Sequence, residues 1–324
     1  MPYHYQCQQC GAEFTSDRRN RQFCSRACQN RANNANAGKR RKRHPLVTAW
    51  ACGGGVDSTA VAALIVEGKL PKPDLAYMTD CGWDSQETWE YVHGETIPRL
   101  RAVGVELQIV KSADYSDAMD VITERGHVVI PAFTMREGKR IRFRTHCSAN
   151  WKSRVARRWL REQGVKRCDN WVGVAADEAG RRRRSPVRWC RNVYPLIELG
   201  MTREDCQWFI GYAGWPKAPR SSCIICPQQS DTRWQRMKRF YPADWERAVA
   251  MEQRIHEQRP DVFLHNSLVP LPEVQFPERP GALGEGVLNL CRSDMDRGGA
   301  KAVFSLYGTE GARRPCHRYQ KTLL

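Results

Sequence analysis

The sequence predicts an α/β protein built on a doubly wound, mostly parallel sheet, with a small N-terminal zinc-binding module and a mainly helical C-terminal part. Three observations support this prediction. Apolar segments of strand length alternate with helical stretches between residues 46 and 175, a glycine turn joins the first of these strands to a helix, and four cysteines lie within the first 28 residues. The chain has 324 residues, which is enough for one large domain with a small appendage.

The expected elements and boundaries follow the chain in order. The apolar strand candidates are 46–52, 74–79, 105–110 and 170–175, and the clearest helical stretches are 86–103 and 149–163. The expected organisation is a four-cysteine zinc knuckle over 1–32, a basic linker over 33–45, a nucleotide-binding α/β domain over 46–200 and a cysteine-containing, mainly helical region over 201–324.

The first segment carries two close cysteine pairs, Cys7-x-x-Cys10 and Cys24-x-x-x-Cys28. Two such pairs separated by a loop can surround one tetrahedral Zn²⁺, with Gly11 permitting the turn behind the first pair. A segment this short cannot bury a core of its own, so a metal must supply its folding energy. The alternative is four unligated thiols in a disordered tail.

The linker that follows is rich in Asn, Ala and Gly and ends in a basic run that contains Arg40, Arg41 and Arg43. Next to a zinc knuckle, such a run is expected to contact the phosphates of nucleic acid. A solvated tail and a nuclear localisation signal are the alternatives.

A glycine turn follows the first strand of the expected sheet. Its residues are Gly53, Gly54, Gly55 and Val56, and Asp57, Ser58 and Thr59 then open an apolar helix. Glycines let the backbone approach an anion, and a helix N-terminus offers free N–H groups and a positive dipole end. The pattern predicts a phosphate cradle that is not a Walker A loop, because no Gly-Lys-Ser/Thr follows at the required spacing. A plain glycine turn with an Asp/Ser helix cap is the alternative.

The turn resembles the Ser-Gly-Gly-x-Asp-Ser motif of PP-loop ATP pyrophosphatases, and further segments are similar to the PAPS-reductase-like branch of that superfamily. These are Thr79-Asp80-Cys81-Gly82 with Glu87-Thr88 downstream, Ala176-Asp177-Glu178 with Arg181, and Ser222-Cys223-Ile224-Ile225-Cys226-Pro227. The resemblance covers roughly residues 46–270. Gly53 and Cys81 depart from it, and the Glu-Cys-Gly-x-x-Cys tail of true PAPS reductases is missing, which disfavours sulfate-assimilating reduction.

The resemblance implies roles for the acidic and hydroxyl residues near the turn. Asp57 and Ser58 would be catalytic, and ATP with Mg²⁺ would be held by 53–59 together with Asp80, Asp177 and Glu178. Ligands in such folds bind beyond the carboxyl ends of the strands, where these residues are expected. For Asp80, Asp177 and Glu178, the equally weighted alternative is ordinary loop acids that pair with nearby arginines.

A second cysteine group contains Cys147 and the compact pair Cys223-x-x-Cys226. Similar PP-loop sulfurtransferases hold a four-iron four-sulfur cluster with one distant cysteine and a Cys-x-x-Cys, which leaves one iron open for sulfide. Soft thiolates suit both iron–sulfur clusters and zinc, so the spacing alone does not choose between them, and buried or redox cysteines are a third option. Cys206 is expected in the core or as a fourth ligand.

Charge and composition indicate the partners. The formal net charge is +17, and Arg181, Arg182, Arg183 and Arg184 form a run with aromatics nearby, which favours nucleic acid over a merely solubilising surface. No apolar stretch of about 20 residues is present, and the N-terminus lacks a signal-peptide core. A cytoplasmic protein without membrane contact is expected, in which cysteines bind metal or undergo redox chemistry.

These inferences combine into an expected activity. ATP would be cleaved to AMP and pyrophosphate, the adenylyl group would activate tRNA or DNA, and a sulfur nucleophile from a cysteine desulfurase or free sulfide would displace it. One alternative is a PAPS-reductase-type oxidoreductase acting on a small sulfonucleotide. The other is a nucleic-acid-binding protein with a vestigial ATP site.

Overall fold

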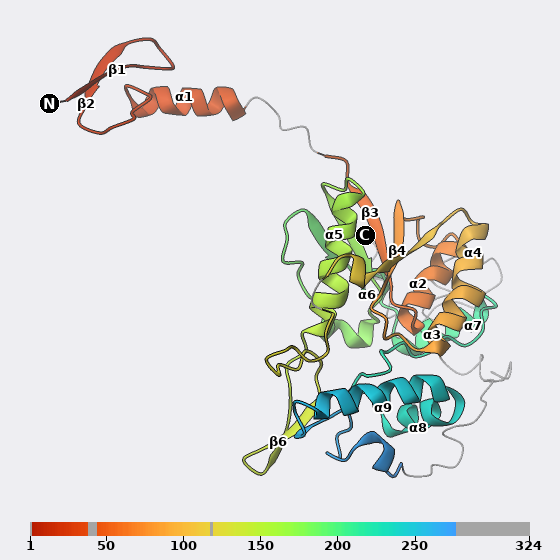
Figure 1. Ribbon diagram of the computed structural model, residues 1–324. Helices are drawn as coiled ribbons and strands as arrows, with labels where there is room; N and C mark the ends of the chain where they lie inside the picture. The colour runs from red at the N-terminus through yellow and green to blue at the C-terminus, as the bar shows by residue number, and fades with distance from the viewer. Residues whose placement is uncertain (1, 38–43, 117–118, 277–324) are drawn as a thin grey trace. The chain divides into compact units, whose positions relative to one another are not determined.

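The computed structural model describes residues 2–37, 44–116 and 119–276 (Figure 1). The chain divides into two compact units, 1–45 and 46–324. Arg40, Arg41 and Arg43 of the basic linker, and residues 277–324 of the expected C-terminal region, lie outside the described residues. In the described part of the chain, no helix combines the length and apolarity needed to cross a bilayer.

The smaller unit is a hairpin followed by a helix. Strands β1 (Tyr3–Gln6) and β2 (Glu13–Ser16) pair antiparallel, and α1 (Arg26–Ala37) follows. Of the side chains described between residues 2 and 32, those of Cys7 and Cys28 are buried. This unit has almost no apolar core of its own, as its length predicts.

The larger unit is built on a parallel five-stranded sheet. Its order is β5-β4-β3-β8-β9, and the strands are β3 (Val47–Cys52), β4 (Leu75–Asp80), β5 (Leu107–Lys111), β8 (Cys168–Val172) and β9 (Cys190–Val193). The four predicted strands are confirmed, with ends that differ by at most three residues. Because the strand order reverses at β3, the crevice between the carboxyl ends of β3 and β8 is the position where such folds bind ligands.

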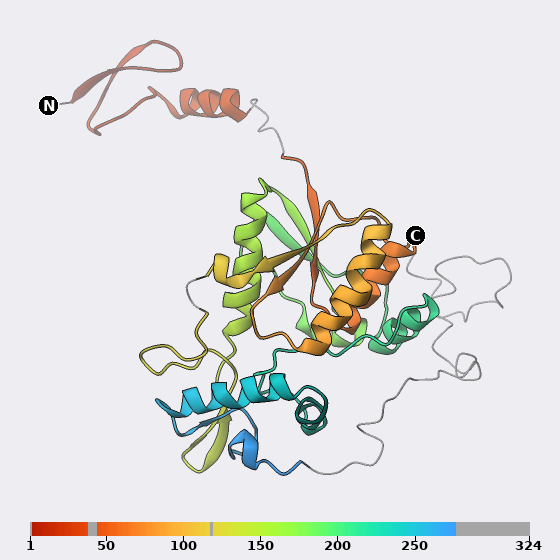
Figure 2. The same ribbon diagram turned by 45° about the vertical axis from the view of Figure 1, so that its right-hand side comes forward.

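Helices cover both faces of the sheet, as a doubly wound fold requires (Figure 2). One face packs on α2 (Val56–Val66), α4 (Ile97–Ala102), α6 (Pro195–Glu198) and α7 (Arg203–Tyr212), and the other on α5 (Arg154–Glu162). Ten of the eleven residues of α2 are buried, because this apolar helix lies between the sheet and α7. The segment α3 (Gln86–Tyr91), η1 (Val92–Thr96) and α4 runs continuously over the predicted helix 86–103.

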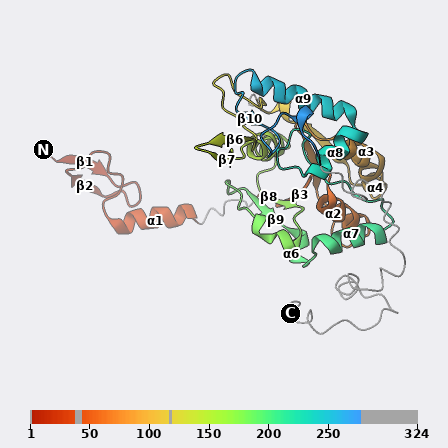
Figure 3. The same cartoon turned by 90° about the horizontal axis from the view of Figure 1, so that it is seen from below.

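A second apolar core lies beside the sheet domain within the larger unit (Figure 3). It contains the small antiparallel sheet β10-β6-β7 and two long helices. Its elements are β6 (Phe133–Arg136), β7 (Lys139–Arg142), α8 (Asp231–Phe240), α9 (Pro242–His256), β10 (Val262–Phe263) and η5 (Leu271–Glu273). The remaining short elements are η2 (Ser112–Asp114), η3 (Ser148–Ser153) and η4 (Ala176–Arg181).

The predicted boundary at residue 200 does not separate the two apolar cores of the larger unit. Phe209, Ile210 and Trp215 belong to the sheet core, whereas Val121, Val128 and Ile130 belong to the second core. The second core therefore includes residues 121–130, which the sequence assigns to the nucleotide-binding domain.

Candidate active site at the carboxyl edge of the sheet

The glycine turn lies where β3 ends and α2 begins. Gly55 is the residue before the helix, and among the described residues no side chain caps the helix at this position. The Gly53 N–H donates to Ser58 Oγ over 2.8 Å, which closes the turn, and the Thr59 N–H donates to Gly55 O as the first helical bond. The N–H groups of residues 55–58, between these two bonds, have no partner within the helix and lie at the positive end of its dipole, a position that suits an anion.

Close packing explains why glycine occupies the turn. Gly54 has φ +67°, and a Cβ there would lie 2.6 Å from Cγ2 of the buried Thr88. A Cβ on Gly55 would lie 2.6 Å from Ser221 Oγ, so the segment just before Cys223 packs on the turn. After β8, a Cβ on Gly173 would lie 3.1 Å from the backbone that joins Asp57 to Ser58. A side chain at Gly54 would collide with a buried group, and one at Gly55 or Gly173 would require its neighbour to shift.

Asp57 is 7% exposed and faces inward at the start of α2. Its Oδ2 accepts a hydrogen bond from the Ala175 N–H over 3.2 Å, and its Oδ1 lies 3.2 Å from Arg203 Nε. Burial raises the pKa of Asp57, and the positive charge of Arg203 opposes that shift. Asp57 therefore holds the end of β8 and the start of α7 against the turn.

Arg203, the first residue of α7, is a site residue that the sequence does not reveal. Its backbone N–H donates to Asp177 Oδ1 over 2.9 Å, and its Nη2 lies 3.3 Å from Glu178 Oε2. Glu178 also pairs with Arg181 at 2.5 Å. Glu178 thus makes the arginine pairs that are the alternative to binding Mg²⁺ or ribose, whereas Asp177 accepts a backbone N–H.

Asp80 ends β4, and its Oδ1 accepts the Gly82 N–H over 2.7 Å. It is half-buried at the same edge of the sheet as the glycine turn. A carboxylate there suits Mg²⁺ by the chemistry of its oxygens.

A cavity of about 280 Å³ opens at the carboxyl ends of four strands, between the sheet, α5 and the arginine run. Its floor includes Tyr77, whose hydroxyl donates to Asn170 Oδ1 over 2.8 Å. Its positive residues are Lys152, Arg157, Arg181 and Arg183. An apolar floor with a positive rim suits a planar base attached to an anionic group.

The arginine run is exposed at all four positions, from Arg181 to Arg184. Arg183 is anchored, because its N–H donates to the Tyr194 hydroxyl over 2.8 Å and its guanidinium donates to Gly180 O and Arg182 O. The run therefore joins the cavity to the protein surface.

The second cysteine group also lies beside the end of β4. Cys223 forms a backbone bridge with Asp84, and the Ile224 N–H donates to Trp83 O over 2.7 Å. Cys147 and Cys223 pack against the second core, and the charge of Cys226 contributes to the raised pKa of Cys147, which burial dominates. Cys147, Cys223 and Cys226 thus gather in one region. Cys206 is buried in α7 within the sheet core and is not part of this group.

Sequence reasoning does not identify Cys81 as a member of this group. Its Sγ lies 3.6 Å from Cys223 Sγ and 3.5 Å from Asp84 Oδ2. Lys152 Nζ lies 3.1 Å from the other carboxylate oxygen of Asp84. The sequence does hold one signal: position 81 has cysteine where the motif has threonine. In the structure the thiol of Cys81 is a candidate metal ligand.

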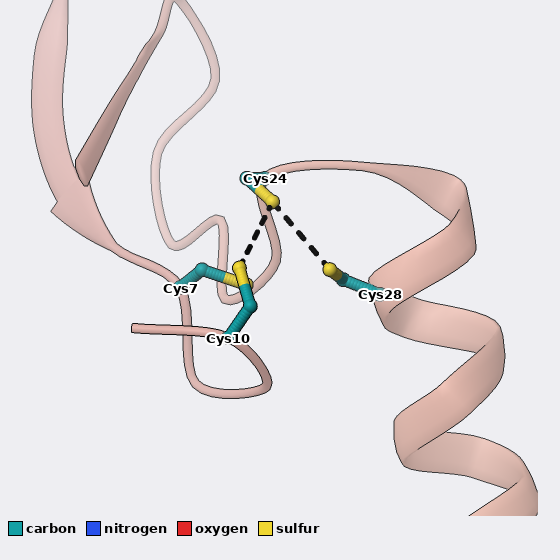
Figure 4. Close-up of side chains that lie close together, drawn as sticks. All are labelled: Cys7, Cys10, Cys24 and Cys28. Carbon is teal, nitrogen blue, oxygen red and sulfur yellow. Dashed lines mark hydrogen bonds between the residues drawn. The ribbon is translucent and has the colours of Figure 1, made fainter. Parts of the chain in front are cut away.

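The four cysteines of the smaller unit face one another (Figure 4). Cys24 Sγ lies 3.6 Å from both Cys10 Sγ and Cys28 Sγ, and all four sulfurs lie within 4.8 Å of one another. Gly11 has φ +75°, and its N–H donates to Cys7 O over 2.8 Å, which forms the predicted turn. Neighbouring thiols, led by Cys28, raise the pKa of Cys24 to about 12, so the four thiols cannot easily ionise together without a cation.

No family model matches the sequence, and no curated protein sequence matches it. Among solved structures, the chain is similar to phosphoadenylyl-sulfate (PAPS) reductase from Candida auris in its phosphate complex, with 12% identity and a TM-score of 0.36 over 60% of this chain and 89% of that chain. It is also similar to the U34-tRNA thiolase NcsA from Methanococcus maripaludis with its 4Fe–4S cluster, with 15% identity and a TM-score of 0.37 over 78% of this chain and 87% of that chain.

Proposed function

We propose that this protein cleaves ATP to AMP and pyrophosphate and uses the adenylyl group to activate a nucleic acid, tRNA or DNA, for sulfur transfer. The observation that carries the proposal is the glycine turn at the start of α2. It offers free N–H groups at the carboxyl edge of a parallel sheet, at the crevice between β3 and β8.

The turn is suited to the phosphates of ATP. Its N–H groups would stabilise negative charge that develops as the bond between the α and β phosphates breaks, and the Ser58 hydroxyl lies within the same turn. Mg²⁺ would neutralise phosphate charge, and Asp80 is the carboxylate best placed to hold it. Asp57 acts as a positioning residue, because its carboxylate fixes Ala175 and Arg203 around the turn.

The 280 Å³ cavity is suited to the rest of the nucleotide or to the reacting base. Its apolar floor would receive a planar ring, and Arg181 and Arg183 would meet the attached phosphate. The exposed run that continues to Arg184 extends this positive charge to the surface, where a polynucleotide backbone would lie.

The second half of the reaction needs a sulfur nucleophile. Hydrosulfide would displace AMP from the adenylated nucleic acid, forming a bond to sulfur as the bond to the AMP oxygen breaks. A persulfide delivered by a cysteine desulfurase would attack through its outer sulfur, and a second thiol would then cleave the S–S bond and leave that sulfur on the nucleic acid. Adenylation itself does not use the cysteines around Cys223, so the proposal holds for either an iron–sulfur cluster or a zinc ion at that place.

The test is an ATP turnover assay with and without tRNA or DNA, with both pyrophosphate and orthophosphate measured. Pyrophosphate and AMP should form with the right nucleic acid, and Ser58→Ala should reduce their rate. Ser230→Ala is the matched control, because Ser230 is an exposed residue before α8 whose side chain makes no capping bond. Release of ADP and orthophosphate would contradict the proposal. Nucleic-acid binding without turnover would indicate a vestigial ATP site.

A further inference from the structure

The thiol of Cys81 places an unexpected fourth cysteine in the group around Cys223. Cys81 follows β4 and is 3% exposed, and its sulfur lies 3.6 Å from that of Cys223, 142 residues later in the chain. These two sulfurs and a carboxylate oxygen of Asp84 all lie within 4.8 Å of one another.

The spacing of the two sulfurs discriminates between kinds of metal centre. In a tetrahedral site with a Zn–S distance of about 2.3 Å, two sulfurs stand about 3.8 Å apart. In a four-iron cluster each thiolate binds a different iron, so the thiolates stand farther apart. The distance of 3.6 Å equals the Cys10–Cys24 and Cys24–Cys28 distances in the smaller unit. Cys81 and Cys223 therefore fit a single ion better than a cluster.

Asp84 has the surroundings of a third ligand. Its side chain is 1% exposed, and its Oδ1 is held by Lys152 Nζ at 3.1 Å, which leaves Oδ2 toward Cys81 at 3.5 Å. A buried carboxylate oriented by a second polar group is typical of metal ligands in proteins. Lys152 thus contacts the carboxylate oxygen of Asp84 that does not face Cys81.

Cys226 can complete the four ligands. It shares the Cys-x-x-Cys turn with Cys223, which the Cys226 N–H closes by donating to Cys223 O over 3.0 Å.

We propose that Cys81, Asp84, Cys223 and Cys226 bind one soft divalent cation, for which Zn²⁺ is the best fit. The ion joins the end of β4 to the segment 221–226, whose Ser221 packs on the glycine turn. Its four protein ligands leave no coordination position for sulfide. This inference goes beyond the proposed function, since adenylation does not use the site.

The test is elemental analysis of the full chain, purified without oxygen from cells supplied with both zinc and iron. The wild type should carry about two zinc ions per chain by the four-ligand rule, one in each cysteine group. A Cys7→Ser/Cys10→Ser variant should keep one zinc, and adding Cys81→Ser should remove it. Cys206→Ala is the control, because that buried thiol lies in the other core and should leave the zinc content unchanged.

A milder variant guards against loss of folding. Asp84→Asn should weaken retention of the same zinc against a chelator by about 10–100-fold. Equal iron and acid-labile sulfide in wild type and Cys81→Ser would overturn the inference in favour of a three-thiolate cluster at Cys147, Cys223 and Cys226. A Cys81–Cys223 disulfide in anaerobic, metal-free protein would also overturn it. Pyrophosphate release measured on the same samples reports the proposed function separately.

Discussion

Gly54 gives the sharpest test of how the glycine turn is built. Replacing it with alanine puts a side chain at φ +67°, where an L-residue costs about 1–2 kcal/mol. The new Cβ would also lie 2.6 Å from Thr88 Cγ2 and 3.3 Å from Met78 Cε and Val92 Cγ2, and all three side chains are at most 1% exposed. Overpacking at a site with no room to relax costs about 1–3 kcal/mol more. Gly54→Ala should therefore lower the free energy of unfolding by about 2–5 kcal/mol.

Gly68 is the matched control. It follows the same helix with the same φ of +67°, and a Cβ on it would have no atom of the described chain within 4 Å. Gly68→Ala should therefore cost the backbone strain alone, about 1–2 kcal/mol. It should leave pyrophosphate release unchanged, whereas Gly54→Ala should abolish it.

A second substitution isolates the steric part of the Gly54→Ala cost. Thr88→Ser removes Cγ2 and keeps the hydroxyl, which lies 2.9 Å from Ser85 Oγ. The double variant Gly54→Ala/Thr88→Ser should be more stable than the sum of the two single changes predicts.

Urea unfolding followed by tryptophan fluorescence measures these costs in the larger unit alone, because residues 1–45 contain no tryptophan. Equal costs for Gly54→Ala and Gly68→Ala, or additive behaviour of the double variant, would refute the reasoning.

Three further predictions concern charge and metal. Asp57→Asn should slow pyrophosphate release, because the uncharged amide no longer pairs with Arg203 and holds the turn less firmly. Because burial raises the pKa of Asp57 above its usual 3.8, ionisation costs the wild type stability as the pH rises through and above 3.8. The unfolding free energies of wild type and Asp57→Asn should therefore diverge in the variant's favour as the pH rises above 3.8, and parallel curves would contradict this. Cys24→Ser should remove one zinc from the smaller unit, measured by elemental analysis, without changing tryptophan-monitored unfolding of the larger unit. Arg182→Gln/Arg184→Gln should reduce the salt dependence of nucleic-acid binding by up to about two units of slope, and an unchanged slope would place the polynucleotide elsewhere.

The parts of the fold that depend on local pattern could be predicted from the sequence. The parallel strands, the turn at Gly53–Gly55 and the cysteine pairs of the smaller unit each show a short-range signal, in apolar runs or fixed spacings. The β6–β7 hairpin is absent from the predicted elements, although Glu137-Gly138, both at positive φ, marks a two-residue turn. Three of the four residues of β7 are basic, so its sequence resembles a charged surface segment rather than a strand.

Contacts between distant segments could not be predicted. The partner of Asp57 is Arg203, which lies far along the chain and is recognisable only once α7 packs on α2. Cys81 and Cys223 meet for the same kind of reason, because the segment after β4 pairs with a loop from the second core. Spacing rules detect ligands that share a turn, but not ligands that the tertiary fold assembles.

The π-helical segment η3, Ser148–Ser153, makes the region between Cys147 and α5 sensitive to length rather than to composition. A π turn holds one residue more than an α turn, and each residue advances an α-helix by about 100°. Losing one residue from η3 would let it relax into an ordinary helix and would swing Lys152 away from Asp84. Substitutions at the exposed positions of this segment are therefore tolerable, whereas a single insertion or deletion would change the register of every contact that its side chains make. The number of residues in this helical segment is therefore as important to the site as their identity.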